Sequence, residues 1–168
     1  SIAAALAPEL RRLERDLVAD GWSVVRHDVE RSRSVEEVKA LVRATWAADP
    51  QSTKSLLLFG HVPVPYSGRS AFDGHYTVGA YGQHTGAWTA DNYYGELTSG
   101  FGVDGWTDEF VTDTGAAYAD YTPRPENFNI PGDGKLDQDY APSELELAVG
   151  RVDLSNMPAF GQTEVALL

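Results

Sequence analysis

His61 is the first residue in the chain whose position predicts a chemical role. It directly follows the apolar run 55–60, which has the length and composition of a strand buried on both faces. In parallel α/β sheets, ligands and catalytic groups lie at the carboxyl ends of strands. A general base there needs a nucleophile and an orienting carboxylate nearby. Since the chain has no Gly-x-Ser-x-Gly elbow, the preferred interpretation of His61 is a loop-capping residue.

An acidic loop offers a second kind of chemistry. Residues 127–139 are rich in Asn, Asp and Gly, and they carry side-chain oxygens at Asn129, Asp133, Asp137 and Asp139. Calcium requires several hard oxygen ligands on a backbone that can wrap the ion. The spacing differs from that of an EF-hand because the carboxylates follow the central glycine. We therefore expect either a calcium site or a solvated polar turn.

The remaining candidates give weaker signals. His75 and His84 are nine positions apart, which is not the spacing of a zinc-binding pair on a helix, so they are expected to be loop residues, with zinc as the lesser alternative. A second acidic cluster and a group of aromatic residues lie in the same region; the aromatics could bind a sugar or peptide, or pack the loop onto its domain. The acidic cluster consists of Asp104, Asp108, Glu109 and Asp113. The aromatic residues are Tyr76, Tyr81, Trp88, Tyr93, Tyr94, Phe101 and Trp106.

The composition excludes several classes of function. The 168 residues include no cysteine, which rules out disulfides, thiolate metal sites and a cysteine nucleophile within them. The net charge of −12 argues against binding to nucleic acid, because phosphate binding needs a basic face. No apolar run approaches the length of a membrane span. No basic segment followed by an apolar one opens the chain, so any signal peptide is expected to be absent or removed. The Gly-, Tyr- and Asp-rich, lysine-poor composition indicates a secreted or cell-surface bacterial protein.

The order of elements positions these groups on an α/β domain. Leucines at helical spacing predict a helix over 3–20, and Ser34 to Glu37 has the form of a capping box that opens a helix over 34–48. Apolar runs predict parallel strands at 22–28, 55–60 and 145–152, joined by right-handed crossovers. A last helix is expected over 157–168, and short strands at 88–97 and near Phe110. The long segment 62–143 is otherwise irregular, which is typical of functional loops.

Three stretches together resemble the gingipain-type cysteine peptidases, which have a caspase-like fold. Residues 56–60 (Leu-Leu-Leu-Phe-Gly), followed by prolines at 63 and 65, look like that family's buried strand. Residues 89–97 (Thr-Ala-Asp-Asn-Tyr-Tyr-Gly-Glu-Leu) look like its Ser-Asp-x-x-Tyr-Gly segment, and residues 146–152 (Glu-Leu-Ala-Val-Gly-Arg-Val) look like its strand ending in Gly-Arg. The order matches, although His61 stands where the family commonly has Asp and the insert after Trp106 is longer than expected.

The resemblance implies a three-layer α/β sandwich with a mainly parallel sheet. Residues 1–168 would be the amino-terminal part of one such domain, with 62–143 as a long insertion and with both ends of the chain cut. The family's catalytic His and Cys lie further along than this chain reaches, so no residue here inherits either role. His61, Asp91, Tyr94 and Arg151 would be cleft or structural residues, and a polypeptide substrate and the remainder of its own chain would be the partners.

Two functions follow from these expectations. The chain is either the scaffold of a secreted, gingipain-like endopeptidase, inactive alone, or a calcium-stabilised binding or adhesion module with the same fold and no catalytic dyad. A nucleotide binder would fit the β-α-β start, but no Gly-x-Gly-x-x-Gly or Walker loop follows any predicted strand.

Overall fold

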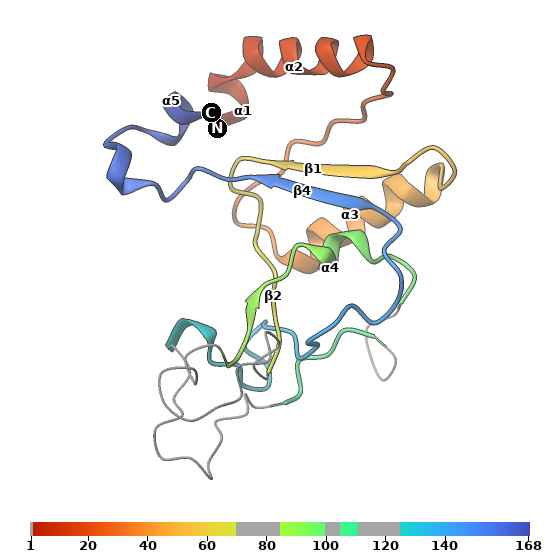
Figure 1. Ribbon diagram of the computed structural model, residues 1–168, viewed down its shortest axis with the longest axis vertical. Helices are drawn as coiled ribbons and strands as arrows, with labels where there is room; N and C mark the ends of the chain where they lie inside the picture. The colour runs from red at the N-terminus through yellow and green to blue at the C-terminus, as the bar shows by residue number, and fades with distance from the viewer. Residues whose placement is uncertain (1, 70–84, 100–104, 111–124) are drawn as a thin grey trace. The chain divides into compact units, whose positions relative to one another are not determined.

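The fold is a mixed α/β arrangement with a small parallel sheet (Figure 1). It is taken from a computed structural model that describes residues 2–69, 85–99, 105–110 and 125–168. The chain consists of two compact units, the first made of 1–33, 57–63 and 151–168 and the second of 34–56 and 64–150. Each strand of the parallel sheet contributes residues to both units.

The amino-terminal helix of unit 1 is interrupted by a proline. Helix α1 (Ile2–Ala5) ends just before α2 (Ala7–Ala19), which carries Pro8 in its first turn. Proline has no N–H for an interior helical bond but is tolerated in a first turn. Gly21 follows with φ +94°, the left-handed conformation expected after a helix end. The predicted helix 3–20 is therefore present in two pieces.

Helix α3 (Val35–Ala48) of unit 2 forms as its sequence predicts. The Ser34 hydroxyl accepts a hydrogen bond from the Glu37 N–H at 3.2 Å, and the Glu37 carboxylate accepts one from the Ser34 N–H at 2.9 Å. These two bonds satisfy N–H groups that a helix end otherwise leaves unpaired. Val38 and Val42 are buried on the apolar face, and Asp49 caps the carboxyl end of the helix.

The parallel sheet joins β1 (Ser55–Phe59) to β4 (Ala148–Val152). At one end the Ala148 N–H donates to the Lys54 carbonyl at 3.0 Å, and at the other the Gly60 N–H donates to the Val152 carbonyl at 2.8 Å. The strand predicted from 145 begins only at Ala148. The reason is that the N–H groups of Glu146 and Leu147 donate instead to the Gly95 carbonyl.

Strand β1 is not buried on both faces, contrary to the sequence-based prediction. Leu58 is 3% exposed, whereas Leu57 is 50% exposed. Within the described residues β1 pairs with β4 alone, so each strand of the sheet is an edge. A short apolar run indicates a strand, but it does not tell how many strands flank it.

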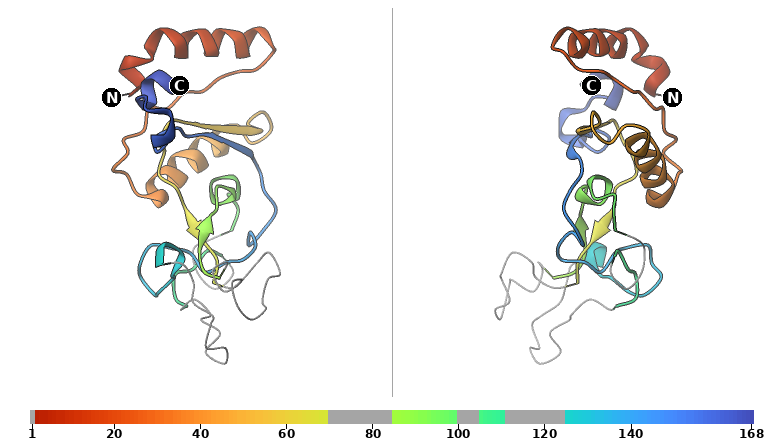
Figure 2. Two further views of the ribbon diagram at one scale, coloured as in Figure 1. Left: turned by 60° about the vertical axis from the view of Figure 1, so that its left-hand side comes forward. Right: turned by 90° about the vertical axis from the view of Figure 1, so that its right-hand side faces the viewer.

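A second, antiparallel sheet in unit 2 precedes helix α4 (Asn92–Gly95). It joins β2 (Tyr66–Ser67) and β3 (Trp88–Thr89), which are the yellow and green arrows of Figure 2. Tyr66 pairs with Thr89. The strand predicted over 88–97 is thus two residues long and gives way to a helical turn. A short 3₁₀ helix, η2 (Pro125–Asn127), lies further along the chain.

Two other predicted strands are absent from the residues that the structure describes. Residues 22–28 form no strand: Arg26 is bonded at 3.0 Å to Glu14 and at 2.9 Å to Asp28, and no ladder partner is present among the described residues. Residues 105–110 form no strand, because the N–H groups of Glu109 and Phe110 donate to the carboxylate of Asp137.

The single helix predicted over 157–168 is replaced by two short pieces. The 3₁₀ helix η3 (Pro158–Phe160) ends at Gly161, which has φ +59°. Thr163 then begins α5 (Glu164–Leu167) by accepting a hydrogen bond from the Ala166 N–H. A glycine in the left-handed conformation closes one helix, and a threonine cap opens the next.

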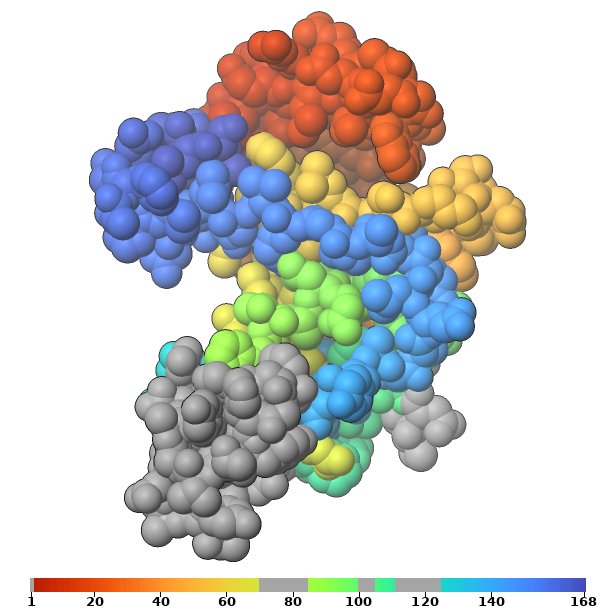
Figure 3. Space-filling view, viewed as in Figure 1, coloured from red at the N-terminus to blue at the C-terminus, as the bar shows by residue number. Residues whose placement is uncertain are grey.

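The core of unit 2 lies between α3, α4 and the strand-like segments around them. Its largest buried side chains are Tyr94 and Trp106, which are 0% and 2% exposed. On the face shown in Figure 3, the light green atoms of 85–99 lie beside the blue atoms of the segment that leads into β4. Gly95 allows this approach: a Cβ there would lie 2.7 Å from the Leu147 carbonyl oxygen.

Candidate functional site

A cluster of polar side chains lies in unit 1 at the carboxyl ends of both parallel strands. His61 follows β1, and Asp153 and Ser155 follow β4. The His61 Nδ1 lies 2.8 Å from an Asp153 carboxylate oxygen and 3.0 Å from the Ser155 hydroxyl. The side chain of His61 is 40% exposed and that of Asp153 16% exposed. The strand-end position expected for His61 is therefore present, together with an orienting carboxylate.

Asp153 is held in its charged form. Its partial burial raises the pKa, but hydrogen bonds from the Ser155 hydroxyl, the Ser155 N–H and His61 outweigh burial and lower the pKa below the usual range. A carboxylate that accepts several hydrogen bonds is stabilised as the anion. At neutral pH Asp153 thus fixes the orientation of the His61 ring.

The cluster does not have the geometry of a Ser-His-Asp triad. In a triad, serine bonds to one ring nitrogen and aspartate to the other, so that the ring can relay a proton. Here Ser155 and Asp153 both approach Nδ1. The arrangement orients a histidine for an external partner rather than activating Ser155.

Arg151, at the end of β4, stabilises the loop that carries His61. Its guanidinium donates to the carbonyls of Val62 at 2.6 Å and Pro63 at 3.2 Å, and it lies 3.9 Å from Asp153. Arginine can serve several acceptors at once because its donors have a fixed fork geometry. Arg151 is accordingly a structural residue of this strand-end cluster.

The other two residues suggested by the family resemblance lie in unit 2. Tyr94 is completely buried, with its ring centroid 5.6 Å from that of Tyr93. Asp91 is half-buried at the start of α4, where its carbonyl accepts a hydrogen bond from the Tyr94 N–H at 3.0 Å. Both residues support the α4 turn.

The four predicted calcium ligands are hydrogen-bonded to other parts of unit 2. Buried Asp137 accepts bonds from the Thr107 hydroxyl and the Glu109 N–H, each at 2.7 Å. Asp133 pairs with Lys135 at 3.2 Å. Asp139 accepts from the Arg69 N–H, and the Asn129 amide donates to the carbonyls of Gly68 and Leu136.

A carboxylate of the second acidic cluster also bonds to this loop. The carboxylate of Asp108 accepts hydrogen bonds from the N–H groups of Gly132 and Gly134, both at 2.8 Å. Over the ranges that the structure describes, no three acidic or histidine side chains are close enough to hold a metal ion. Calcium binding remains a prediction. His75, His84, Asp104, Asp113, Tyr76, Tyr81 and Phe101 lie outside the described residues.

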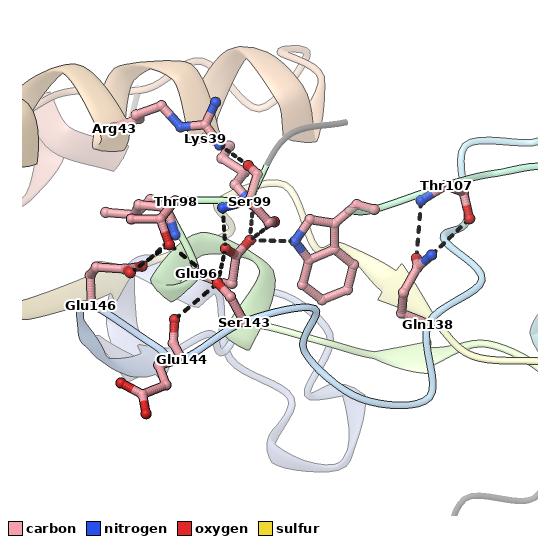
Figure 4. A network of polar contacts seen from close by, with 12 residues as sticks. Lys39, Arg43, Glu96, Thr98, Ser99, Thr107, Gln138, Ser143, Glu144 and Glu146 are labelled. Carbon is pink, nitrogen blue, oxygen red and sulfur yellow. Dashed lines mark hydrogen bonds and ion pairs between the residues drawn. The ribbon is translucent and has the colours of Figure 1, made fainter. Parts of the chain in front are cut away.

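A network of polar contacts in unit 2 surrounds Glu96 (Figure 4). Glu96 is completely buried. Its carboxylate accepts hydrogen bonds from the Trp106 indole at 2.8 Å, the Ser99 hydroxyl and N–H at 2.5 and 2.7 Å, and the Ser143 hydroxyl at 2.5 Å, and it pairs with Lys39 at 3.2 Å. A buried charge with this many partners is energetically permitted, whereas an unpaired one is not.

The charges of this network are shifted in opposite ways. Burial alone raises the pKa of Glu96, but hydrogen bonds from Ser143, Ser99 and Trp106 lower it to about 2. Burial lowers the pKa of Lys39 to about 8, against the attraction of Glu96. At neutral pH the pair is ionic, and Lys39 loses its proton far more readily than an exposed lysine does.

Sequence reasoning missed Asp153, Ser155, Lys39 and Glu96. Asp153 follows a predicted strand, so the rule that placed His61 could also have found it. Glu96 and Lys39 gave no comparable signal, because each has the sequence context of an exposed charge. Lys39, however, lies between the buried Val38 and Val42 positions of α3.

Comparisons with known proteins identify no relative. No family model, curated protein or solved structure matches this chain significantly. Among the described residues, no helix is long and apolar enough to span a membrane. The fold and the site geometry define a mixed α/β protein with a polar cluster at the ends of its parallel strands.

Proposed function

We propose that this chain is the scaffold portion of a gingipain-like cysteine endopeptidase and supplies one wall of its substrate cleft. The catalytic thiolate and its histidine would come from other parts of the protein, since these residues include no cysteine. In such an enzyme a histidine-assisted thiolate attacks the peptide carbonyl and forms an acyl-enzyme.

The observation that carries this proposal is that the three stretches behind the resemblance are hydrogen-bonded to one another. In unit 2 the Gly95 carbonyl accepts from Glu146 and Leu147, and the Ala90 N–H donates to the Pro65 carbonyl at 2.8 Å. In unit 1 the Gly60 N–H donates to the Val152 carbonyl at 2.8 Å. Each of the three stretches thus makes backbone hydrogen bonds with the other two, and this is the support for the proposal.

The His61–Asp153 pair gives the proposed cleft wall a chemical character. It lies at the carboxyl ends of the parallel strands, where α/β folds bind their ligands. Within the described residues the ring bonds only through Nδ1. In the proposed cleft the other ring nitrogen, Nε2, forms a hydrogen bond with a carbonyl or a side chain of the substrate.

The test is a peptidase assay of the complete gene product. This protein should hydrolyse fluorogenic peptides with Arg, Lys, Asp or apolar residues before the scissile bond, and iodoacetamide should abolish this turnover. In the same protein, His61→Ala should raise KM more than it lowers kcat, because a cleft residue contributes to substrate binding rather than to bond cleavage. Turnover that is absent or insensitive to the thiol reagent would overturn the proposal.

The competing function is a calcium-stabilised binding or adhesion module. The observation that favours it is the convergence of Asp108 and Asp133 on one glycine-rich turn, 130–135. The two functions are distinguished by the same assay, since a module without a catalytic dyad hydrolyses no peptide.

A further inference from the structure

Unit 2 contains an open cavity of about 250 Å³ that is lined by α3, α4 and the segment that follows α4. Its α3 wall is formed by Glu36, Lys39, Ala40 and Arg43, which recur at helical spacing and so share one face. Its other walls are Tyr93, Ser99 and Trp106. Lys39 and Arg43 both reach from α3 toward the Glu96–Ser99 segment (Figure 4).

The amine of Lys39 is held among aromatic rings on the wall of this cavity. Nζ lies 4.1 Å from the centroid of the Tyr93 ring and 5.3 Å from that of the Trp106 ring. The lysine side chain is only 7% exposed. A lysine desolvated in this way is the kind that proteins use as a nucleophile toward carbonyl compounds.

Arg43 supplies a second positive charge one helical turn away. Its guanidinium donates to the Ser99 carbonyl at 2.9 Å, which uses one of its five N–H groups. In the described part of the chain, no carboxylate forms an ion pair with it. A guanidinium with spare donors beside a cavity recognises a carboxylate, because its planar fork matches that group.

We propose that this cavity binds a small aldehyde that carries a carboxylate, and that Lys39 condenses with it. The free amine of Lys39 adds to the aldehyde carbon to give a carbinolamine. Loss of water then forms a carbon–nitrogen double bond. The proton that the Lys39 ammonium releases to become a free amine returns to the hydroxyl group that leaves as water. The imine nitrogen therefore keeps one N–H proton and one positive charge.

Conservation of charge is what makes Lys39 suitable for this step. The ammonium of Lys39 pairs with completely buried Glu96. Removing that charge would leave a buried carboxylate without its ion-pair partner, which is costly. A protonated imine keeps the positive charge at the same nitrogen, so Glu96 stabilises the product as it stabilises the free lysine.

The free-amine fraction further distinguishes Lys39. Burial lowers its pKa to about 8, and the unprotonated amine is the nucleophile. The chain contains three lysines, of which the other two are Lys54 and Lys135. Lys54 is exposed and donates to the Pro50 carbonyl, and Lys135 is bonded to Phe128 and Asp133. These two lysines are internal controls.

The experiment treats the purified protein with glyoxylate and sodium cyanoborohydride, which reduces the imine to a stable secondary amine. Peptide mass spectrometry then gives the rate of modification at each lysine. We expect Lys39 to react at least about tenfold faster than Lys54 at pH 7.5, because its free-amine fraction is larger. The measurement on the unaltered protein does not depend on the folding of any variant.

Two variants and a second aldehyde test the recognition of the carboxylate. Arg43→Gln should slow the reaction of Lys39 with glyoxylate severalfold and leave its reaction with acetaldehyde unchanged. Lys54→Arg should change neither rate. Equal reactivity of Lys39 and Lys54, or an equal effect of Arg43→Gln on both aldehydes, would overturn the proposal. Neither result bears on the peptidase assay, so the two proposals fail independently.

Discussion

Glu96 is a buried residue whose charge contributes to the stability of unit 2. It is completely buried, yet the donors around it keep its pKa at about 2, below the ordinary value of 4.5. A carboxyl group whose folded pKa is lowered stabilises the fold above its unfolded pKa. That stabilisation should be fully present above pH 4.5 and should be lost as the pH falls toward 2.

We predict that Glu96→Gln lowers the free energy of unfolding by about 3 kcal/mol at pH 7, since 2.5 pKa units correspond to roughly that amount. The variant also leaves the ammonium of Lys39 without its carboxylate. Its stability should depend less on pH between about 5 and 2 than that of the parent protein. Urea unfolding at a series of pH values measures both effects.

The control is Glu144→Gln, because Glu144 is an exposed acidic residue of the same unit. This substitution should change neither the free energy of unfolding at pH 7 nor the loss of stability as the pH falls from about 5 to 2. If the free energy of unfolding of Glu96→Gln depended on pH in the same way as that of the parent protein, the role assigned to Glu96 would be contradicted.

The two polar clusters could be predicted from the sequence to different degrees. His61 was found because it follows an apolar run, and position in a parallel sheet is a strong guide. Its bond to Asp153 could not be predicted, because it requires knowing that β1 and β4 are neighbours. The burial of Glu96 and Lys39 was missed because it depends on tertiary packing, which local composition does not report.

At the scale of elements, the sequence predicted those features whose hydrogen-bond partners lie within a few residues in the chain. The capping box of α3 and the glycine after α2 were predicted because their bonds are made within a few residues. The strand at 22–28 was wrong because β structure requires a partner from elsewhere. The helix over 157–168 was wrong because Gly161 could be read as an ordinary helical position.

The contact between α4 and β4 gives a prediction at this scale. At Gly95, a Cβ would lie 2.7 Å from the Leu147 carbonyl oxygen and 2.8 Å from a Val149 methyl group. Gly95→Ala therefore forces the turn away from the strand. Overpacking of this kind costs about 1–3 kcal/mol, which should lower the melting temperature by about 3–10 °C.

Gly150→Ala is the matched control, because a Cβ at Gly150 meets nothing within 4 Å. Its melting temperature should lie within about 1 °C of that of the parent protein, as is usual for substitutions away from packed sites. Equal melting of the two variants would mean that the α4–β4 contact does not hold the turn in place.

At the scale of the whole molecule, the alternation of helices and strands predicted a mixed α/β fold with parallel strands. It did not predict the division of the chain into two units, nor the small size of the parallel sheet. Both depend on contacts between segments that are far apart in sequence, such as 54–60 with 148–152. Sequence patterns predict which segments form helices and strands, but they do not predict which of these elements pack against one another.

The calcium prediction applies to the molecule as a whole because a ligand that binds only the folded state raises its stability. Millimolar calcium should raise the melting temperature by a few degrees, and a chelator should reverse the rise. Asp133→Ala should abolish this response, since Asp133 lies on the exposed turn and is a predicted ligand. Glu144→Gln should respond as the parent protein does. A response retained in Asp133→Ala would place the ion elsewhere.

The last prediction is that these 168 residues hydrolyse no peptide by themselves. A thiol peptidase needs a thiolate, and the chain has no cysteine. A serine mechanism needs the serine and the aspartate on opposite nitrogens of the histidine, whereas Ser155 and Asp153 both bond to Nδ1 of His61. The assay incubates the purified chain with fluorogenic peptides bearing Arg, Lys, Asp and apolar residues before the scissile bond, and we expect no release above that of buffer. Turnover that survives repurification and iodoacetamide would show that a complete active site lies within these residues, with the His61 cluster the first place to look for it.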